Sequence, residues 1–353
     1  MHHKIRLESV LPTFVPTGFP DLGPSTVRDA RDGKTLLIVD SVQSIANHLE
    51  ATIVAKPGQV IDGLETMPYG RLCITDSHGR TQSSSSLELP HRLASGWFCR
   101  SGELKSFQEE LTQRILKDGI AAATFYYCPN SLLHGVFYSQ LSSLDATVHI
   151  TKSPRLLTAE IVARGAHPIK DGGMARDPLT INGKEFDLET AFPKRDKESE
   201  SAKENPASRV GLGFILFPHY AYVAEEIELA VYLAQGRIDR LPLPEPARQV
   251  LALLARLKLA RLLAEPLDLR AHCIFTAPEV PQELADPAGL LAALQEQLEA
   301  CRQLGLLAEP AVTEFALTLA AAKEKPKKAK AGAAATPTGA DAGSEAAQDE
   351  EPG

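Results

Sequence analysis

The sequence has few cysteines, and none of them stands in the spacing of a metal site. Its five cysteines occur singly along 353 residues, and no C-x-x-C pair is present. Cysteine-based zinc sites need closely spaced pairs, and small disulfide scaffolds need many more cysteines for their length. We therefore expect a protein of a reducing compartment, without a cysteine-bound metal.

Long apolar runs are absent as well. No stretch reaches the roughly 18 uninterrupted apolar residues that a membrane-spanning helix needs. The segment from Met1 to Leu7 contains histidines, a lysine and an arginine in place of the apolar core of a signal peptide. The expected location is therefore cytoplasmic, without insertion into a membrane.

The signatures of several enzyme classes are also missing. The sequence has no G-x-S-x-G elbow, no G-x-x-x-x-G-K-[ST] phosphate loop and no H-E-x-x-H pair, which mark serine hydrolases, nucleotide hydrolases and zinc proteases. Its ten histidines form no spaced cluster with cysteine. We expect no metal and no cofactor, and the residues nominate no acid–base pair for catalysis.

The charge is mildly acidic but uneven along the chain. With 37 basic and 45 acidic residues the formal net charge is -8, which argues against a partner held by phosphate neutralisation alone. The acid excess lies mainly in the C-terminal third. The first two-thirds can therefore still form a local basic groove, and a hydrophobic content of 44% is enough for a substantial core.

A strand followed by a helix is the clearest local pattern. The run from Thr35 to Val39 is short and apolar, and Asp40 and Ser41 after it are residue types that cap helices. From Val42 to about Val54, apolar residues recur with helical spacing on one side. The opposite side of this helix carries four neutral polar residues: Gln43, Ser44, Asn47 and His48.

The remaining patterns predict a mixed α+β chain. Strands are expected at Ile5–Val15, Ala122–Tyr127, Gly135–Tyr138, Ala146–Ile150 and Leu156–Arg164. Helices are expected at Leu104–Lys117, Pro246–Ala264 and Asp286–Leu307. The Asn-Gly pair within Thr180–Phe186 is typical of a tight hairpin turn. The charged segment 194–206 is expected to be exposed, and the low-complexity tail 323–353 is expected to be disordered.

Three groups of polar residues could contact a ligand. The polar face of the 42–54 helix could hold sugar hydroxyls, phosphates or base edges without burying charge, although an ordinary solvated face is an equal alternative. His91, Arg92 and Ser95 suit a phosphate, because arginine forks onto oxygen and serine donates. The glycines in 208–213 would let the main chain approach a ligand, or simply allow close strand packing.

Longer motifs make a known family recognisable. They are P-T-G-F-P-D-L-G at 16–23, D-S-V-Q-S-I-A-N-H-L-E at 40–50, H-R-L-A-S at 91–95 and S-R-V-G-L-G at 208–213. In order and spacing, the sequence from about Ile5 to Cys301 resembles the RAMP backbone subunit of type I-G (formerly I-U) Cascade-like CRISPR effector complexes. His48 stands where many relatives of that family carry arginine.

The resemblance implies a fold for most of the chain. It is a ferredoxin-like (RRM-type) RAMP palm with inserted finger and thumb elements and a helical C-terminal part, and the hairpin at Thr180–Phe186 is the candidate thumb. The implied boundaries are 1–222 for the palm with inserts at 56–100 and 167–207, 223–322 for an acidic helical lobe packing on the palm, and 323–353 for the tail.

The resemblance also implies a non-catalytic subunit that binds CRISPR RNA. Copies of it would oligomerise along the guide RNA with other effector subunits, and would present the guide for pairing with target DNA in antiviral defence. Because every guide differs, the contacts would go to backbone and shape rather than to base sequence. The residues expected to contact RNA are Gln43, Ser44, Asn47, His48, His91, Arg92, Ser95, Arg164, Arg209, Gly211 and Gly213.

Two alternative functions stay open on the sequence. Some RAMP relatives cut RNA, so the chain could be a RAMP-type endoribonuclease that processes or cleaves RNA. Its mark would be a His, Tyr or Asp whose replacement abolishes cleavage but not binding. The other alternative is an α+β protein whose polar helix is merely exposed, and such a protein would purify free of nucleic acid.

Overall fold

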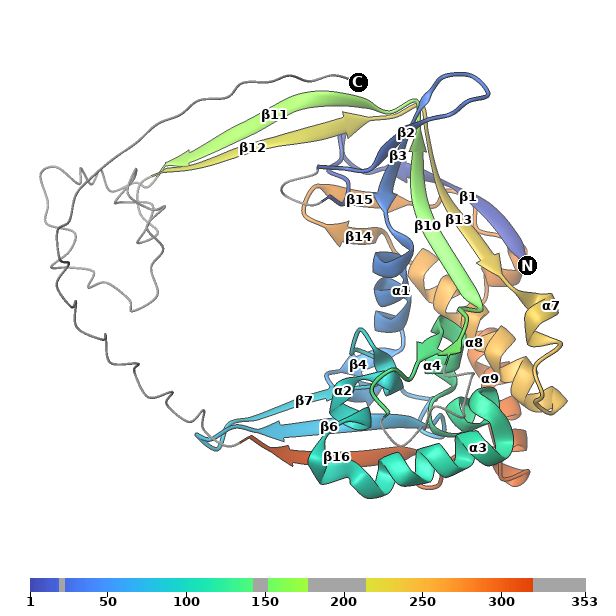
Figure 1. The fold of residues 1–353 in the computed structure, drawn as a ribbon. Helices are drawn as coiled ribbons and strands as arrows, with labels where there is room; N and C mark the ends of the chain where they lie inside the picture. The colour runs from blue at the N-terminus through green and yellow to red at the C-terminus, as the bar shows by residue number, and fades with distance from the viewer. Residues whose placement is uncertain (19–22, 142–151, 177–213, 320–353) are drawn as a thin grey trace, which may run out of the picture.

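The structure, a computed structural model, is a mixed α+β fold built on two main sheets (Figure 1). It describes residues 1–18, 23–141, 152–176 and 214–319. A seven-stranded sheet lies at one end, a three-stranded sheet lies at the other, and helices lie between them. The predicted α+β class is confirmed.

The large sheet brings together strands from both ends of the chain. Its order is β14-β15-β1-β13-β10-β3-β2, and each neighbouring pair is antiparallel. Along β10 and β13, buried and more accessible residues alternate, so one face of the sheet is buried and the other is open. The strands are β1 (His2–Ser9), β2 (Thr26–Arg28), β3 (Thr35–Asp40), β10 (Leu157–Arg164), β13 (Glu226–Leu233), β14 (Leu267–Arg270) and β15 (Cys273–Thr276).

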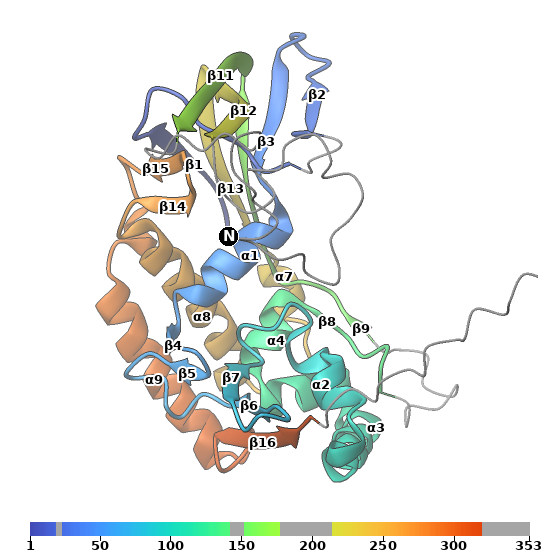
Figure 2. The ribbon, with the colours of Figure 1, turned by 90° about the vertical axis from the view of Figure 1, so that its left-hand side faces the viewer.

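Three helices cover the buried face of the large sheet. α1 (Val42–Ala51) and α4 (Pro129–His134) both contact β10, and α8 (Glu245–Leu263) packs on both helices. Figure 2 shows α1 and α8 against the strands. In chain order α1 lies between β1 and β10, and α8 lies between β13 and β14. The apolar residues of these elements form one continuous core.

The start of α1 follows the sequence prediction. The Oγ of Ser41 accepts a hydrogen bond from the backbone N–H of Ser44 at 3.3 Å, which satisfies one of the unpaired donors of the first turn. Asp40 does not cap the helix, because its carboxylate accepts a hydrogen bond from Arg270 of β14. The strand β3 and the helix α1 are therefore confirmed, although the helix ends three residues before the expected Val54.

The second sheet joins the first half of the chain to its C-terminal region. β16 (Val312–Thr318) runs parallel to β6 (Tyr69–Thr75), which pairs with β7 (Thr81–Ser85). The ring of Phe315 on β16 lies 4.9 Å from the Phe98 ring and 4.8 Å from the Phe107 ring. The core under this sheet therefore depends on residues more than two hundred positions apart.

Further helices and short strands accompany the two sheets, and the helix α9 packs on α8. The helical elements are η1 (Arg92–Ala94), α2 (Gly96–Cys99), η2 (Gly102–Leu104), α3 (Lys105–Tyr127), α7 (Gln235–Ile238), η4 (Gln282–Leu284) and α9 (Pro287–Gln303). The short strands are β4 (Val54–Lys56), β5 (Gln59–Val60), β8 (Val136–Phe137) and β9 (Lys152–Ser153). Asp286 caps α9 through Gly289 and the predicted C-terminal helices are confirmed, but the segment 223–322 also supplies β13, β14 and β15 to the large sheet.

A long hairpin extends the central pair of the large sheet. β11 (His167–Arg176) follows β10, and β12 (Phe214–Val223) leads into β13, with ten paired positions between them. Figure 1 shows this hairpin reaching away from the rest of the fold. The predicted turn at Thr180–Phe186, the strand at Ala146–Ile150, the segment 194–206 and the tail 323–353 lie outside the described residues.

One strand prediction is wrong. The run Ala122–Tyr127 is the last part of α3, which resumes after Gly119 leaves helical geometry at φ 85°. The aromatic residues that favour a strand are used here in helix packing: the ring of Tyr127 meets that of Phe107 edge-on at 5.3 Å. The opening strand is also shorter than expected, because β1 ends at Ser9.

Removing the Phe315 ring is expected to destabilise the whole protein. Phe315 is buried between two aromatic rings, so Phe315→Ala should lower the free energy of unfolding by about 3–5 kcal/mol in equilibrium urea unfolding. Leu304→Ala is the control, because the Leu304 side chain is 59% exposed. Equal losses for the two variants would contradict a shared core under β16.

Candidate nucleic-acid interface

A buried ion pair joins α1 to η1. The Arg92 guanidinium donates two hydrogen bonds to the Glu50 carboxylate, from Nε to Oε1 and from Nη2 to Oε2, each at 2.7 Å. Both side chains are buried. Arg92 reaches this position from a backbone φ of 53°, which is uncommon for a residue with a side chain. Both oxygens of the Glu50 carboxylate thus accept a hydrogen bond from the guanidinium, and the positive charge of Arg92 compensates the negative charge of Glu50.

Three further side chains extend this pair into a buried polar cluster. Asn130 of α4 donates to Glu50 at 2.7 Å and accepts from Lys258 of α8. The Lys258 ammonium also lies 2.9 Å from Nε2 of His134. We call Glu50, Arg92, Asn130, His134 and Lys258 the buried polar cluster. It ties α1, η1, α4 and α8 together at one point.

Burial controls the protonation of the cluster. It lowers the pKa of Lys258 to about 7, against an ordinary value of 10.5. Burial, with the positive charges of Lys258 and Arg92, also holds the pKa of His134 well below its ordinary value. At neutral pH the cluster therefore contains a neutral imidazole and a lysine near its midpoint.

A basic cleft opens beside this cluster. It is a cavity of about 730 Å³ whose lining includes two arginines, one lysine and two histidines. None of its lining residues in the described part of the chain is Asp or Glu. The ring of Phe137 lies in its wall with 57% exposure. We use the name basic cleft for the cavity lined by His91, Arg92, His134, Phe137, Lys152 and Arg155 with their neighbours.

Pairing of two short strands places the basic residues of the far wall. Phe137 of β8 is the partner of Lys152 of β9 in the ladder. Arg155 follows, and its guanidinium donates to the carbonyls of Val42 at 3.1 Å and His134 at 3.3 Å. Partial burial lowers the pKa of this arginine, and no carboxylate is among the hydrogen-bond partners described for it. Among the described residues no ion pair is formed by Arg155, although the charge of Glu50 acts on it.

The predicted polar face of α1 lies elsewhere. Gln43 and Asn47 are exposed and Ser44 is half-buried, and Asn47 lines a separate cavity that includes Glu50 and Glu88. The Nε2 of His48 lies 3.8 Å from a carboxylate oxygen of Asp40. The structure therefore does not bring this face together with the basic cleft.

The other predicted residues have mixed surroundings. His91 and Arg92 line the basic cleft, and Ser95 caps α2 beside it by accepting from the Trp97 backbone at 3.4 Å. Arg92 is already paired with Glu50, and Arg164 of β10 is paired with Asp29 and Asp32. RNA contact by these residues stays a prediction. Arg209, Gly211 and Gly213 lie outside the described residues.

Sequence reasoning missed the far wall of the cleft. Phe137, Lys152 and Arg155 line it, and none was among the predicted RNA-binding residues. The only signal is two basic residues three positions apart, Lys152 and Arg155, and such a pair is too common to single out. Their joint position follows from strand pairing, not from any motif.

Within the described ranges, His, Cys, Asp and Glu side chains form no group of three or more that could hold a metal ion. None of the helices in those ranges is long and apolar enough to cross a membrane. All five cysteines are free thiols, and burial raises the pKa of Cys99 to about 12 and that of Cys273 to about 11.

The comparison with known families bears on this same part of the chain. Residues 10–168 match the family model of the CRISPR-associated protein GSU0053 (Cas_GSU0053). The match supports a role in CRISPR-Cas defence. It covers somewhat less than half of the chain, and every residue that lines the basic cleft falls within it. No curated protein matches the sequence.

Removing one partner of the buried ion pair should lower the free energy of unfolding more than removing both partners. Arg92→Met leaves a buried carboxylate without its guanidinium and should lower the free energy of unfolding by about 3–5 kcal/mol. Glu50→Gln/Arg92→Met removes both charges and should lose less than the single variant. Urea unfolding of wild type, both single variants and the double variant measures the coupling. A coupling near zero would contradict the pair described above.

Replacement of the buried lysine should change how stability depends on pH. Because the folded-state pKa of Lys258 is about 7 and the ordinary value is 10.5, the unfolded chain binds more protons between these values. Wild-type stability should therefore rise relative to Lys258→Met as the pH increases from about 7 to about 10. Below about pH 7 the difference should be constant. Urea unfolding of both proteins across this range measures it, and a flat difference throughout would contradict the shifted pKa.

Proposed function

We propose that this chain is a non-catalytic CRISPR RNA-binding backbone subunit of a type I-G Cascade-like surveillance complex. Copies of it would line up along one guide RNA with other effector subunits and present the guide to target DNA. The observation that carries the proposal is the basic cleft, whose lining lies wholly within the span that matches a CRISPR-associated family model.

The chemistry of the cleft suits an RNA backbone. Lys152 and Arg155 offer positive charge to phosphate oxygens. The described lining contains no carboxylate that would repel the phosphates. The exposed Phe137 ring beside them offers a face on which a base can stack. Such contacts do not depend on base identity, and a subunit that must hold every guide sequence needs contacts of this kind.

The acidic net charge is compatible with this role. Each subunit needs only a few phosphate contacts when several copies bind one strand, because the copies act together. No described residue that lines the cleft is acidic, and the Glu50 carboxylate is paired with Arg92.

The topology supports a RAMP palm within the large sheet. The strands β15, β1, β13 and β10 are adjacent in that order, with α1 and α8 as the two connecting helices. This order is consistent with the β-α-β-β-α-β arrangement of ferredoxin-like domains, with β2 and β3 added between β1 and α1. The β11–β12 hairpin, which continues two palm strands outward, is then the candidate thumb.

The open face of the sheet is a poor alternative site for RNA. RNA-recognition sheets stack bases on aromatic residues at the centre of their open face. Here the exposed aromatic residue Tyr232 lies near the end of β13, while Glu160 and Glu228 occupy the middle of the central strands on that side. Lys4 is already 3.3 Å from Glu228. An RNA strand would meet carboxylates there, whereas it meets only basic and neutral groups in the cleft.

An endoribonuclease is the second candidate, favoured by one feature. His91 and His134 both line the cleft, and histidine is the residue that most often moves protons in RNA cleavage. Recovery of intact RNA after long incubation with the protein, with no loss over time, would leave only the binding role.

Neutralising Lys152 should weaken RNA binding without regard to sequence. Lys152 is exposed in the cleft wall, so Lys152→Gln should lose one phosphate contact, worth about fourfold in Kd at about 0.15 M salt. The slope of log Kobs against log salt should become shallower by about 0.7. Fluorescence anisotropy with two labelled RNAs of unrelated sequence measures both quantities.

Lys117→Gln is the matched control, because Lys117 is an exposed lysine of α3 that lines none of the cavities described here. It should leave the affinity and the salt slope unchanged. Losses that differ between the two RNAs, or equal losses for the two variants, would contradict binding through the basic cleft.

A further inference from the structure

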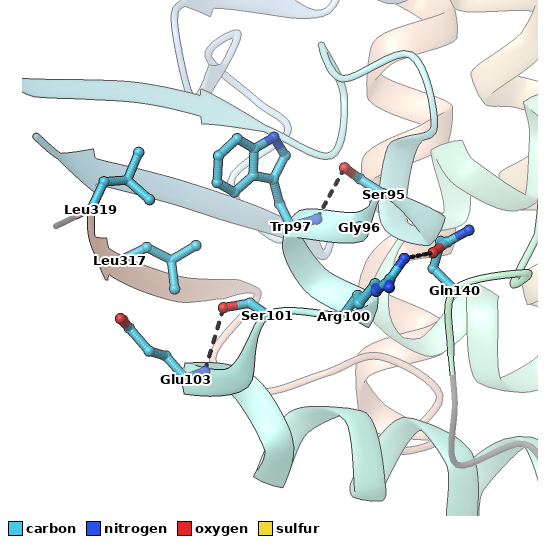
Figure 3. Close-up of a pocket in the computed structure, with 9 residues that line it drawn as sticks. All are labelled: Ser95, Gly96, Trp97, Arg100, Ser101, Glu103, Gln140, Leu317 and Leu319. Carbon is cyan, nitrogen blue, oxygen red and sulfur yellow. Dashed lines mark hydrogen bonds between the residues drawn. The ribbon is translucent and has the colours of Figure 1, made fainter. Parts of the chain in front are cut away.

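A second cavity lies next to the basic cleft and differs from it in character. Its volume is about 570 Å³. Figure 3 shows the Trp97 ring of α2 and the side chains of Leu317 and Leu319 facing the same space. On another side, Arg100 donates a hydrogen bond to Gln140 at 3.1 Å. The cavity thus has apolar walls and a polar rim.

The side chain that dominates this cavity is unusually accessible for its size. Trp97 is 37% exposed, although tryptophan commonly contributes most of its large surface to a core. Leu319 beside it is 42% exposed. Both side chains therefore have apolar surface in contact with water, and a flat, uncharged ring bound in the cavity would cover that surface.

The two cavities are contiguous. Gly96 and Gln140 line both of them. A β-carbon built on Gly96 would meet no atom within 4 Å, so the space around this residue is open. The Phe137 ring thus lines one of two adjoining cavities and the Trp97 ring lines the other.

We propose that the second cavity binds an unpaired nucleobase of the RNA, stacked on Trp97, while the phosphates of the same strand lie in the basic cleft. The inference rests on the proposed function. It adds a base-stacking subsite that is separate from the polar contacts in the basic cleft. Basic residues alternating with exposed aromatic faces are the usual arrangement for single-stranded nucleic acid.

A nucleobase fits this space better than an aliphatic side chain. A base has two apolar faces for Trp97 and the leucines. Its polar edge can meet the polar side chains at the rim, which are Arg100, Gln140, Ser101 and the acidic Glu103. Because stacking uses the ring face that every base has, the subsite should accept all four bases. That tolerance matches a protein that must hold unrelated guides.

The protein carries its own probe for the test. Trp97 is the single tryptophan among 353 residues, so emission excited beyond tyrosine absorption reports this cavity alone. Titration of the full chain with a short single-stranded RNA should quench that emission. An RNA of equal length and charge with abasic positions should bind in anisotropy measurements but leave the emission almost unchanged.

Two variants separate stacking from folding. Trp97→Leu should weaken binding of the base-containing RNA at least fivefold and leave the abasic RNA unaffected, whereas Trp97→Phe should retain most of the affinity. Gly96→Leu keeps the tryptophan and every charge but fills the open space around this position, and it should abolish quenching. Urea unfolding of each variant shows whether the fold is intact.

The outcomes distinguish this inference from the proposed function. If RNA binds with the salt dependence expected of the cleft, but Trp97 emission and the Trp97→Leu affinity do not change, the subsite is wrong and the RNA-binding role stands. If neither RNA binds, the proposed function itself fails. Emission that responds only to protein concentration would assign the cavity to a contact between copies of the chain, and would also overturn the subsite.

Discussion

The pairing of Arg92 with Glu50 is the interaction on which the rest of the site depends. It fixes the position of η1 against α1, and through Asn130 it connects to Lys258 on α8. The helices that cover the sheet and the segment that borders the cleft thus share one set of buried hydrogen bonds. A buried charge that lost its partner would lower the free energy of unfolding far more than an exposed one. The ion pair therefore holds these elements in fixed positions relative to one another.

This arrangement also determines the electrostatics of the surface. The Glu50 carboxylate forms an ion pair with Arg92, which lines the cleft. Lys152 and Arg155 also line the cleft, and no acidic residue is among the described residues of its lining. A chain with an overall charge of -8 can in this way present a locally basic groove. The acids Glu160 and Glu228 lie on the open sheet face and are not among the residues that line the cleft, which is why the proposed RNA path follows the cleft.

How much of this could be predicted depends on whether a feature is local. The strand β3, the helix α1 and its Ser41 cap follow from residues within a few positions of one another, and the structure confirms them. The aromatic run at Ala122–Tyr127 is ambiguous locally, since burial in a helix suits those residues as well as a strand does. The partners of Arg92 and Lys258 are 42 and 128 residues away in the sequence, so no pattern along the chain reveals them.

The candidate site shows the same limit. His91 and Arg92 could be singled out from their residue types, but the strand pairing that adds Lys152 and Arg155 could not. The parallel pairing of β16 with β6, which builds one wall of the second cavity, is equally a tertiary result.

In the proposed role, this chain holds guide RNA irrespective of the RNA sequence. The most direct measurement is to co-express it with a CRISPR array of unrelated spacers and the neighbouring effector subunits, digest the purified protein with nuclease, and sequence the protected RNA. The account predicts protected fragments from all spacers, with regularly spaced lengths, and ultraviolet cross-links that map to residues 90–155. Protein that is free of RNA, or RNA from a single sequence only, would contradict it.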